Sequence, residues 1–392
     1  MKRAQLILAK GKEKSLERHH PWIFSGAIAK HIGKPKEGDL VDVIDGSGHW
    51  LCVGHYQNES IMVKVLSYEE REIDEVFWIK RLAVAIDYRK RLGFFDNKEC
   101  NVFRLIYSEG DFLPGLVADW YNGIVVMQAS SVGMYKMIPQ LATLLKELMG
   151  DKLIAVFDKS AATVPGGGVE NKYVLGEGPE EWEICEWGNR MLINFYEGQK
   201  TGFFVDQRDN RKLIAELSKG KRVLNTFGYT GGFSLGALRG GASYVETVDV
   251  SKKSIALCNR NVEMNFGKEA PHVGVVADVL KYLDNIKKDF DIIILDPPAF
   301  VKTHKALQHG LKGYRTINQK AIKAIKSGGL LMTFSCSQSV SKEDFQTVVF
   351  SAANLAGRKV RIVKQLPHAM DHPVSIYHPE GEYLKGLLLY VE

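Results

Sequence analysis

The sequence has few cysteines and no long hydrophobic run. Its five cysteines are odd in number, lie far apart and form no C-x-x-C pair, which argues against a disulfide framework or a structural zinc site. The apolar run after Arg3 is too short for a secretory signal, and charges interrupt each later apolar stretch before it reaches membrane-spanning length. We therefore expect a soluble protein of a reducing cytoplasm, with no membrane contact and no bound metal.

Charge of one sign is not in large excess either. The 392 residues include 52 Lys and Arg against 46 Asp and Glu, a formal net charge of +6. This balance permits a polyanionic partner on a basic face without requiring one. Hydrophobic residues make up 45% of the chain, enough for several cores, and at about 100–200 residues per domain two or three domains are expected.

The apolar pattern changes twice along the chain. Residues 1–75 contain short alternating segments such as 40–45 and 50–54, which predict a small β-barrel-like module. Residues 76–186 begin with helical spacing over 77–89 and continue with strands and a helix over 134–149, which predicts a mixed α+β unit. From residue 187 to 392, short apolar strands alternate with helices, which predicts an α/β domain with a parallel sheet covered on both faces.

One strand of the predicted parallel sheet leads into a glycine-rich loop. The strand ends at Asn225, the loop contains Phe227, Gly228, Tyr229 and Gly231, and a helix is expected from about Leu235. Asp249 ends the next strand about 20 residues later, where a carboxylate accepts hydrogen bonds from ribose hydroxyls. The loop is neither G-x-G-x-x-G nor a P-loop, so a nucleoside without phosphates, such as S-adenosylmethionine, is favoured. The alternative is that the glycines only pack a helix and Asp249 caps one.

A third strand of this sheet ends at Asp278, whose carboxylate could accept a bond from an adenine amine. A fourth ends in the turn D-P-P-A-F at 296–300. Two prolines remove two backbone donors and hold the chain extended, so neighbouring carbonyls can face a ligand. Asp296, Pro297 and Phe300 then suit a planar base that carries an exocyclic amine. The alternative is a strand terminator beside a core phenylalanine.

A cysteine, Cys336, follows the next apolar strand on the same expected ligand side. Cysteine is often an inert buried residue, and that interpretation fits Cys52, Cys100, Cys185 and Cys258. Cys336 differs because serines flank it at a strand end. A thiolate there could attack a pyrimidine ring if local donors or cations lowered the pKa of the thiol.

The segment 299–329 contains no acidic residue. Its basic residues would attract the phosphates of a nucleic acid, and we select Lys302, Lys305 and Arg315 as substrate contacts. For Lys320, Lys323 and Lys326, a solvated helix face is an equally good interpretation.

Seven segments together resemble the bacterial rRNA large-subunit methyltransferase I family, which makes 5-methylcytidine in 23S rRNA. The resemblance covers essentially the whole chain. The segments are HPWIFSGA at 20–27, EGQKTGFFVDQR at 197–208, NTFGYTGGF at 225–233, DPPAF at 296–300, SCS at 335–337, DHPV at 371–374 and PEGEYLKG at 379–386.

The resemblance implies a PUA-type RNA-binding barrel over residues 1–75, a central domain over 76–186 and a Rossmann-like class I methyltransferase domain over 187–392. It implies that Cys336 adds to carbon 6 of cytosine, that Asp296 contacts ring nitrogen 3, and that 23S rRNA or a large-subunit precursor is the substrate. It also places Lys200, Phe204 and Gln207 near the methionine part of the cofactor. Several relatives carry a second cysteine in the D-P-P turn that is absent here, so the base that removes the carbon 5 proton is unassigned.

Two other functions remain open from the sequence. An amino methyltransferase acting on guanine or adenine of RNA would also use the D-P-P turn, without a cysteine nucleophile. A non-catalytic rRNA assembly factor would use the barrel and the basic segment, with a degenerate cofactor pocket. The modified nucleotide, the choice between naked rRNA and a precursor particle, and the choice between monomer and homodimer are not determined by the sequence.

Overall fold

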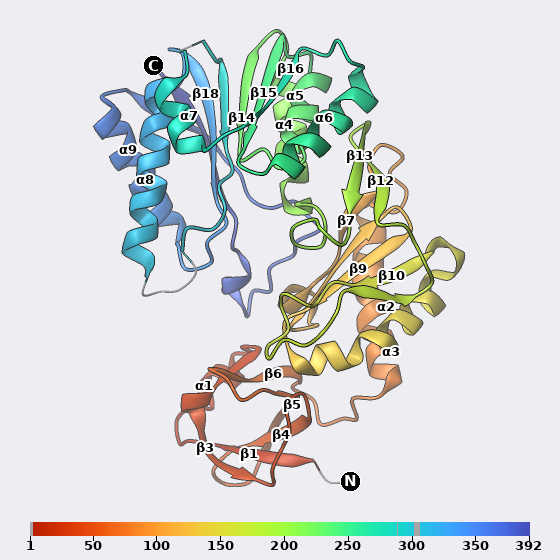
Figure 1. Cartoon of the computed structure of the whole chain (residues 1–392). Helices are drawn as coiled ribbons and strands as arrows, with labels where there is room; N and C mark the ends of the chain where they lie inside the picture. Colours follow the sequence, from red (N-terminus) through yellow and green to blue (C-terminus); the bar gives the residue numbers. More distant parts are fainter. Residues whose placement is uncertain (1–2, 288, 302–305) are drawn as a thin grey trace. The chain divides into compact units, whose positions relative to one another are not determined.

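The computed structural model describes residues 3–287, 289–301 and 306–392, and the chain divides into two compact units (Figure 1). The first unit comprises Met1–Cys185, Ile193–Val205 and Met370–Gly381, and the second comprises Glu186–Leu192, Asp206–Ala369 and Glu382–Glu392. The division into three parts at residues 75 and 186 stays a prediction.

The first unit begins with a six-stranded sheet in the order β2-β6-β5-β4-β1-β3. The alternation expected over 40–45 forms a strand whose valines, Val41 and Val43, are fully buried. Leu6, Ile23 and Val63 join them in one core. The elements are β1 (Ala4–Leu8), α1 (Lys14–Glu17), β2 (Trp22–Phe24), β3 (Ile28–Ile32), β4 (Leu40–Ile44), β5 (Trp50–Tyr56) and β6 (Ile61–Ser67).

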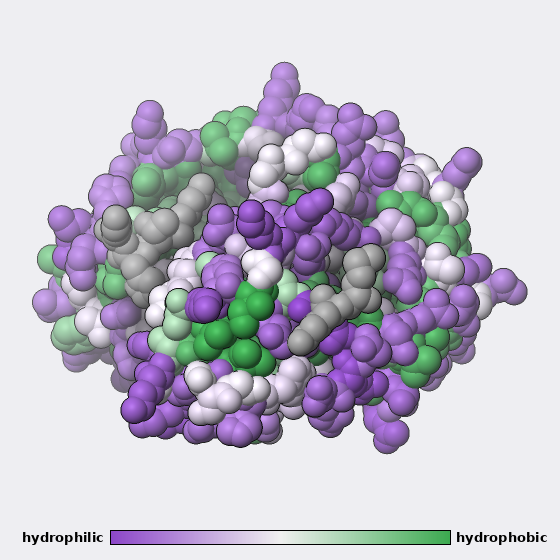
Figure 2. Space-filling view, turned by 90° about the horizontal axis from the view of Figure 1, so that it is seen from below, coloured by the Kyte–Doolittle hydropathy of each residue, from purple (hydrophilic) through white to green (hydrophobic). Residues whose placement is uncertain are grey.

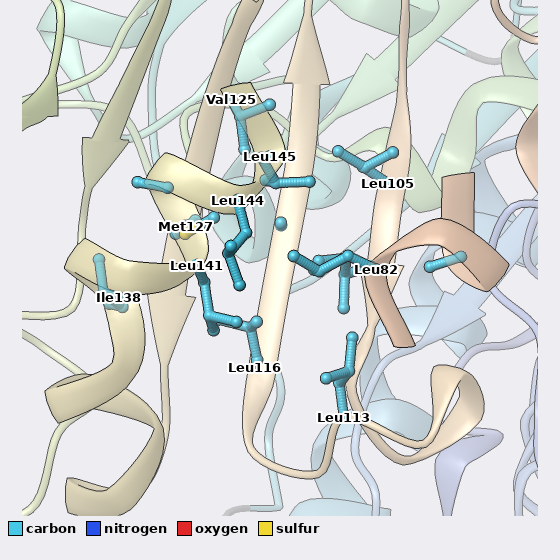
Figure 3. Packing of buried hydrophobic residues seen from close by; sticks show 14 of the residues in the cluster. Leu82, Leu105, Leu113, Leu116, Val125, Met127, Ile138, Leu141, Leu144 and Leu145 are labelled. Atoms are coloured by element: carbon cyan, nitrogen blue, oxygen red, sulfur yellow. The ribbon is translucent and has the colours of Figure 1, made fainter. Parts of the chain in front are cut away.

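A second sheet of the first unit has the order β11-β10-β9-β8-β7 and carries two long helices. Figure 3 shows leucines of α2 and α3 packed against the strands. Both helices were expected from apolar spacing, and each begins with a side-chain cap, Asp74 for α2 and Ser131 for α3. The elements are α2 (Glu75–Arg91), β7 (Val102–Tyr107), β8 (Leu116–Tyr121), β9 (Ile124–Ala129), α3 (Val132–Met149), β10 (Ala155–Asp158) and β11 (Lys172–Leu175).

The second unit is built on a seven-stranded sheet in the order β16-β15-β14-β17-β18-β20-β19. The first five strands are parallel, and β20 runs antiparallel to both of its neighbours. The strands are β14 (Arg222–Thr226), β15 (Tyr244–Asp249), β16 (His272–Val276), β17 (Ile292–Leu295), β18 (Gly329–Ser335), β19 (Val360–Gln365) and β20 (Lys385–Val391). A separate two-stranded sheet consists of β12 (Glu181–Glu186) and β13 (Asn189–Asn194).

Helices cover both faces of the seven-stranded sheet, with α4, α5 and α6 on one face and α7, α8 and α9 on the other (Figure 1). This double cover explains why all four residues of β17 are apolar and buried. The helices are α4 (Arg208–Leu217), α5 (Gly232–Arg239), α6 (Lys252–Phe266), α7 (Val279–Asn285), α8 (Leu307–Ala324) and α9 (Lys342–Ala356). The strand order reverses between β14 and β17, and ligands of such sheets bind at that point, at the carboxyl ends of the strands.

The polar surface and the lack of long apolar helices in the described part of the chain agree with a sequence that has no long hydrophobic run. Figure 2 shows a face on which hydrophilic residues predominate and hydrophobic residues form several separate patches. Within the described residues, every helix is either too short or too polar to cross a membrane. Short 3₁₀ turns occur at Ser25–Ala27, Ser108–Asp111, Gly150–Lys152, Val205–Gln207 and Pro379–Gly381.

Candidate active site

The loop after β14 has an unusual backbone. Phe227 and Tyr229 have φ angles of 54° and 47°, a left-handed conformation that is rare for residues with a side chain. Gly231 has φ +88°, and a Cβ there would lie 2.4 Å from the Cys258 sulfur. Helix α5 begins at Gly232, earlier than the expected position near Leu235, because the left-handed Gly231 already completes the turn. Strained loops of this kind occur at ligand sites.

Asp249 holds this loop in place. It is the last residue of β15, and its two carboxylate oxygens accept hydrogen bonds from the backbone N–H groups of Tyr229 (3.0 Å) and Ser251 (2.8 Å). The structure thus brings together the glycine loop and the acidic residue that the sequence pattern paired. Each carboxylate oxygen has a second lone pair, so the group keeps acceptor capacity for a ligand hydroxyl.

Asn225 in β14 and Gly228 in the loop both contact a buried polar network. The Asn225 amide nitrogen donates to Ser234 (2.9 Å), whose hydroxyl lies 2.6 Å from that of Thr247. The Asn225 side-chain oxygen is buried and has no donor among the described residues, and a Cβ on Gly228 would lie 2.3 Å from a Thr247 methyl group. A buried acceptor without a donor is uncommon. This acceptor, the glycine loop and Asp249 fit a ligand that offers N–H and O–H donors, as a nucleoside does.

The other predicted cofactor residues have different surroundings. Asp278 is exposed and caps α7, accepting from the Lys281 N–H (3.0 Å). Gln207 is buried and accepts from the Asn210 amide (2.7 Å). Lys200, exposed with φ 55°, and Phe204, half-buried, belong to the first unit. The cofactor contacts of these four residues stay predictions.

The D-P-P turn and Cys336 lie next to each other. They follow β17 and β18, which are paired in parallel with Leu295 opposite Thr333. The Cys336 sulfur, half-buried, lies 3.9 Å from the Pro297 carbonyl oxygen. The strand order therefore places the thiol beside the residue that follows Asp296.

Tyr314 of α8 connects the two turns, and it belongs to none of the motifs described above. Its buried hydroxyl lies 2.8 Å from the Ser337 hydroxyl and accepts from the Phe300 N–H (3.4 Å). Ser337 also accepts from the Val301 N–H (3.2 Å), and the Phe300 ring packs 4.7 Å from the Tyr314 ring. Burial raises the pKa of Tyr314, so its hydroxyl stays protonated at neutral pH.

Lys385 is a second residue that sequence reasoning missed. It begins β20, is buried, and donates to the Ser337 carbonyl oxygen (2.8 Å). Burial lowers the pKa of Lys385 to about 8.

The predicted basic contacts are only partly described. Lys302 and Lys305 lie outside the described residues, whereas Arg315 lies half-exposed on α8. Lys320 pairs with Asp284, and Lys326 lies 3.0 Å from Asp291. Because both lysines have acidic partners nearby, the structure favours the solvated-face interpretation for them.

Two of the segments that resemble the family, 20–27 and 379–386, contact each other through His20 and Glu380. The rings of Trp22 and His378 lie 4.3 Å apart, and His20 and His378 lie 3.5 and 3.0 Å from the Glu380 carboxylate. Trp22 donates to Glu109 (2.8 Å).

The first unit also contains a cavity of about 470 Å³, lined among others by Phe77, Arg81 and Phe112. No predicted site residue lines it, so the candidate active site is the strand-end cluster of the second unit.

Comparison with known proteins agrees with this site. The S-adenosylmethionine-dependent methyltransferase family model matches residues 113–353 and a PUA-like domain model matches residues 6–68, which confirms the predicted cofactor and the predicted fold class. The ribosomal RNA large subunit methyltransferase I of Alteromonas mediterranea is 41% identical over 98% of both chains. Its namesake from Escherichia coli is 39% identical over 97% of this chain and 98% of its own.

Solved structures agree on the fold. A SAM-dependent methyltransferase from Streptococcus mutans superposes with a TM-score of 0.85 at 23% identity, covering 98% of this chain and 99% of its own. A second methyltransferase structure, a complex with SAH, has the same TM-score and coverage at 22% identity. From the family models and the full-length relatives, the chain belongs to the ribosomal RNA large subunit methyltransferase I family of S-adenosylmethionine-dependent methyltransferases.

Proposed function

We propose that this protein methylates carbon 5 of a cytosine in large-subunit ribosomal RNA, 23S rRNA or its precursor, through a covalent adduct between Cys336 and carbon 6. The observation that carries the proposal is the position of the half-buried Cys336 sulfur, 3.9 Å from the Pro297 carbonyl at the turn that begins with Asp296. The names of the full-length relatives support the substrate class.

Bound S-adenosylmethionine supplies an electrophilic methyl group on its sulfonium. We assign its ribose to Asp249 and its adenine amine to Asp278, with Asn225, Phe227, Gly228, Tyr229 and Gly231 forming the cradle. The buried orphan oxygen of Asn225 and the strained loop support this assignment. Gln207, Lys200 and Phe204 are proposed contacts of the methionine part.

Cys336 is needed because carbon 5 of cytosine is a poor nucleophile. The thiolate forms a bond to carbon 6, the carbon 5–carbon 6 double bond opens, and carbon 5 becomes enamine-like. Asp296, as a protonated carboxyl, donates to ring nitrogen 3 and stabilises the negative charge that develops there. After carbon 5 is methylated, a base removes its proton, the double bond forms again, and the thiolate leaves.

The cytidine must leave its helical stack to reach both groups. We assign the Pro297 carbonyl as the acceptor for its exocyclic amine and the Phe300 ring, which packs against Tyr314, as a stacking partner. Arg315, with Lys302 and Lys305, would contact flanking phosphates.

The proposal is tested with ribosomal RNA from cells that lack this chain. The purified protein is expected to form 5-methylcytidine, detected by mass spectrometry of nucleosides, and to form a covalent complex with RNA containing 5-fluorocytidine. Cys336→Ala is expected to lose both, while Cys185→Ala, which removes the other half-exposed thiol, keeps both. Methylation by Cys336→Ala, or a product methylated on guanine or adenine, would favour the amino methyltransferase. Binding of S-adenosylmethionine with no methyl group entering RNA would favour the assembly factor.

A further inference from the structure

Lys385 is a buried, positively charged residue at the turn that carries Cys336, the proposed nucleophile. The residue is 5% exposed, and its ammonium donates to the Ser337 carbonyl oxygen at 2.8 Å. In the part of the chain that the structure describes, no ion pair joins Lys385 to a carboxylate. The nearby Glu382 is instead paired with Lys342 (2.6 Å). A buried charge without a counter-ion is costly, because desolvation is not offset by an attractive partner.

The strand register and one hydrogen bond place the Lys385 ammonium at the turn that carries the thiol. Strand β20 runs antiparallel to β18, with Lys385 opposite Ser335, and Cys336 is the next residue after Ser335. The accepting carbonyl belongs to Ser337, on the other side of Cys336. The Lys385 side chain therefore reaches along the turn that carries the thiol.

Burial and three charged groups act on the pKa of Lys385. Burial, the largest effect, and the charge of Lys342 lower the pKa of Lys385, while Cys336 and Glu382 raise it. Tyr314 approaches the same turn from α8 and also feels the charge of Cys336, and Asp296 begins the adjoining turn after β17. Of the acidic groups among them, Glu382 already has a partner in Lys342, and Asp296 is assigned as a neutral carboxyl in the proposed reaction. The Cys336 thiolate is thus a fitting counter-ion for Lys385.

We propose that Lys385 is a positioning residue whose ammonium stabilises the Cys336 thiolate and whose bond to Ser337 fixes the turn on which the thiolate is presented. The inference rests on the proposed role of Cys336. The Cys336 S–H bond breaks, the proton goes to solvent, and the sulfur's negative charge is compensated by the lysine. Cys258 contrasts with this arrangement, because burial raises the pKa of its thiol to about 12 and so disfavours the thiolate.

The test is the rate at which iodoacetamide alkylates Cys336 between pH 5.5 and 10, measured by mass spectrometry of the Cys336 peptide in a Cys185→Ser background. Lys385→Met is expected to reduce alkylation about tenfold at pH 7, the effect of raising the thiol pKa by about one unit. Because Lys385 itself loses its proton near pH 8, the difference from the parent is expected to fade above that pH. A merely structural role would not produce this pH profile.

Three variants keep the test interpretable. Lys385→Arg retains the charge and is expected to keep most of the reactivity, and Lys385→Gln provides a polar neutral side chain if the methionine variant does not fold. Lys364→Met, at an exposed lysine of β19, leaves both the Lys385 ammonium and the Glu382–Lys342 pair in place and is expected to change alkylation less than twofold. Thermal unfolding verifies that each variant is folded.

The covalent trap with 5-fluorocytidine RNA separates this inference from the proposed function. If the parent protein forms the adduct but Lys385→Met and Lys385→Gln keep its alkylation profile, the role of Lys385 is overturned while the proposed function stands. If both variants shift the profile and the parent forms no adduct, Lys385 stabilises the thiolate but the proposed reaction is wrong.

Discussion

Replacing Gly231 by alanine tests the cofactor loop most directly. Gly231 has φ +88°, where an alanine is strained, and its added Cβ would lie 2.4 Å from the Cys258 sulfur and 3.3 Å from the Cys258 Cβ. Cys258 is fully buried on α6, so it cannot rotate into solvent to make room. The substitution therefore combines backbone strain with a steric overlap.

The two contributions have different sizes and different origins. A left-handed alanine costs about 1–2 kcal/mol, and overpacking of a filled core costs about 1–3 kcal/mol. We expect Gly231→Ala to lower the free energy of unfolding by about 2–5 kcal/mol. Because the loop must shift to relieve the overlap, we also expect at least a tenfold weaker affinity for S-adenosylmethionine, which corresponds to about 1.4 kcal/mol.

Two further variants separate these contributions. Gly220→Ala has a comparable φ of +71° with no atom within 4 Å of the added Cβ, so it reports the backbone strain alone. Adding Cys258→Ala to Gly231→Ala removes the overlapping sulfur and is expected to recover the overpacking part but not the strain. Urea unfolding gives the stabilities, and isothermal titration calorimetry gives the cofactor affinities.

The reasoning fails if Gly231→Ala is no more destabilising than Gly220→Ala, since the overlap with Cys258 would then cost nothing. It also fails for the cofactor assignment if stability drops as expected while the affinity for S-adenosylmethionine is unchanged.

Three other predictions concern the same unit. Asp249→Ala is expected to weaken S-adenosylmethionine binding by about a hundredfold or more, because charge-assisted hydrogen bonds are lost. RNA binding, measured in filter assays, is expected to stay unchanged. An equal loss of both affinities would contradict the ribose assignment. Tyr314→Phe leaves Ser337 without its hydroxyl partner and is expected to lower the free energy of unfolding, measured with urea, by about 1–3 kcal/mol. It is also expected to slow methyl transfer while cofactor affinity is retained. Unchanged stability would refute the bridging role. Burial lowers the pKa of His272 to about 4, so below pH 6.5 the unfolded chain binds a proton that the folded chain does not, and stability is expected to fall by about 2 kcal/mol from pH 7 to pH 5. Burial also lowers the pKa of His55 to about 4, so His272→Gln is expected to remove only the contribution of His272, and an equally steep fall in the variant would refute that contribution.

Much of the candidate site could be predicted from the sequence because its members follow apolar strands. In a parallel sheet the carboxyl ends of the strands lie at one edge, so Asn225, Asp249 and Cys336 could be placed at that edge from strand patterns alone. The expected helices over 77–89 and 134–149 were found as α2 and α3 for the same reason, since one apolar face per helix is a local signal. The cofactor and fold class followed from the loop and from the family resemblance.

Neither Tyr314 nor Lys385 follows an apolar strand, so no strand pattern marks either one as a residue of the site. Tyr314 lies inside α8, where an aromatic residue at helical spacing resembles any core residue, and only packing brings its hydroxyl to Ser337. Lys385 begins β20, whose place beside β18 is a matter of strand order rather than of the nearby sequence. Hydrogen bonds between residues 23 and 48 positions apart depend on tertiary contacts that no local pattern encodes. Apolar strand patterns therefore identify the residues at the strand ends, whereas packing between distant segments selects the side chains that hold the thiol and its neighbouring turn in place.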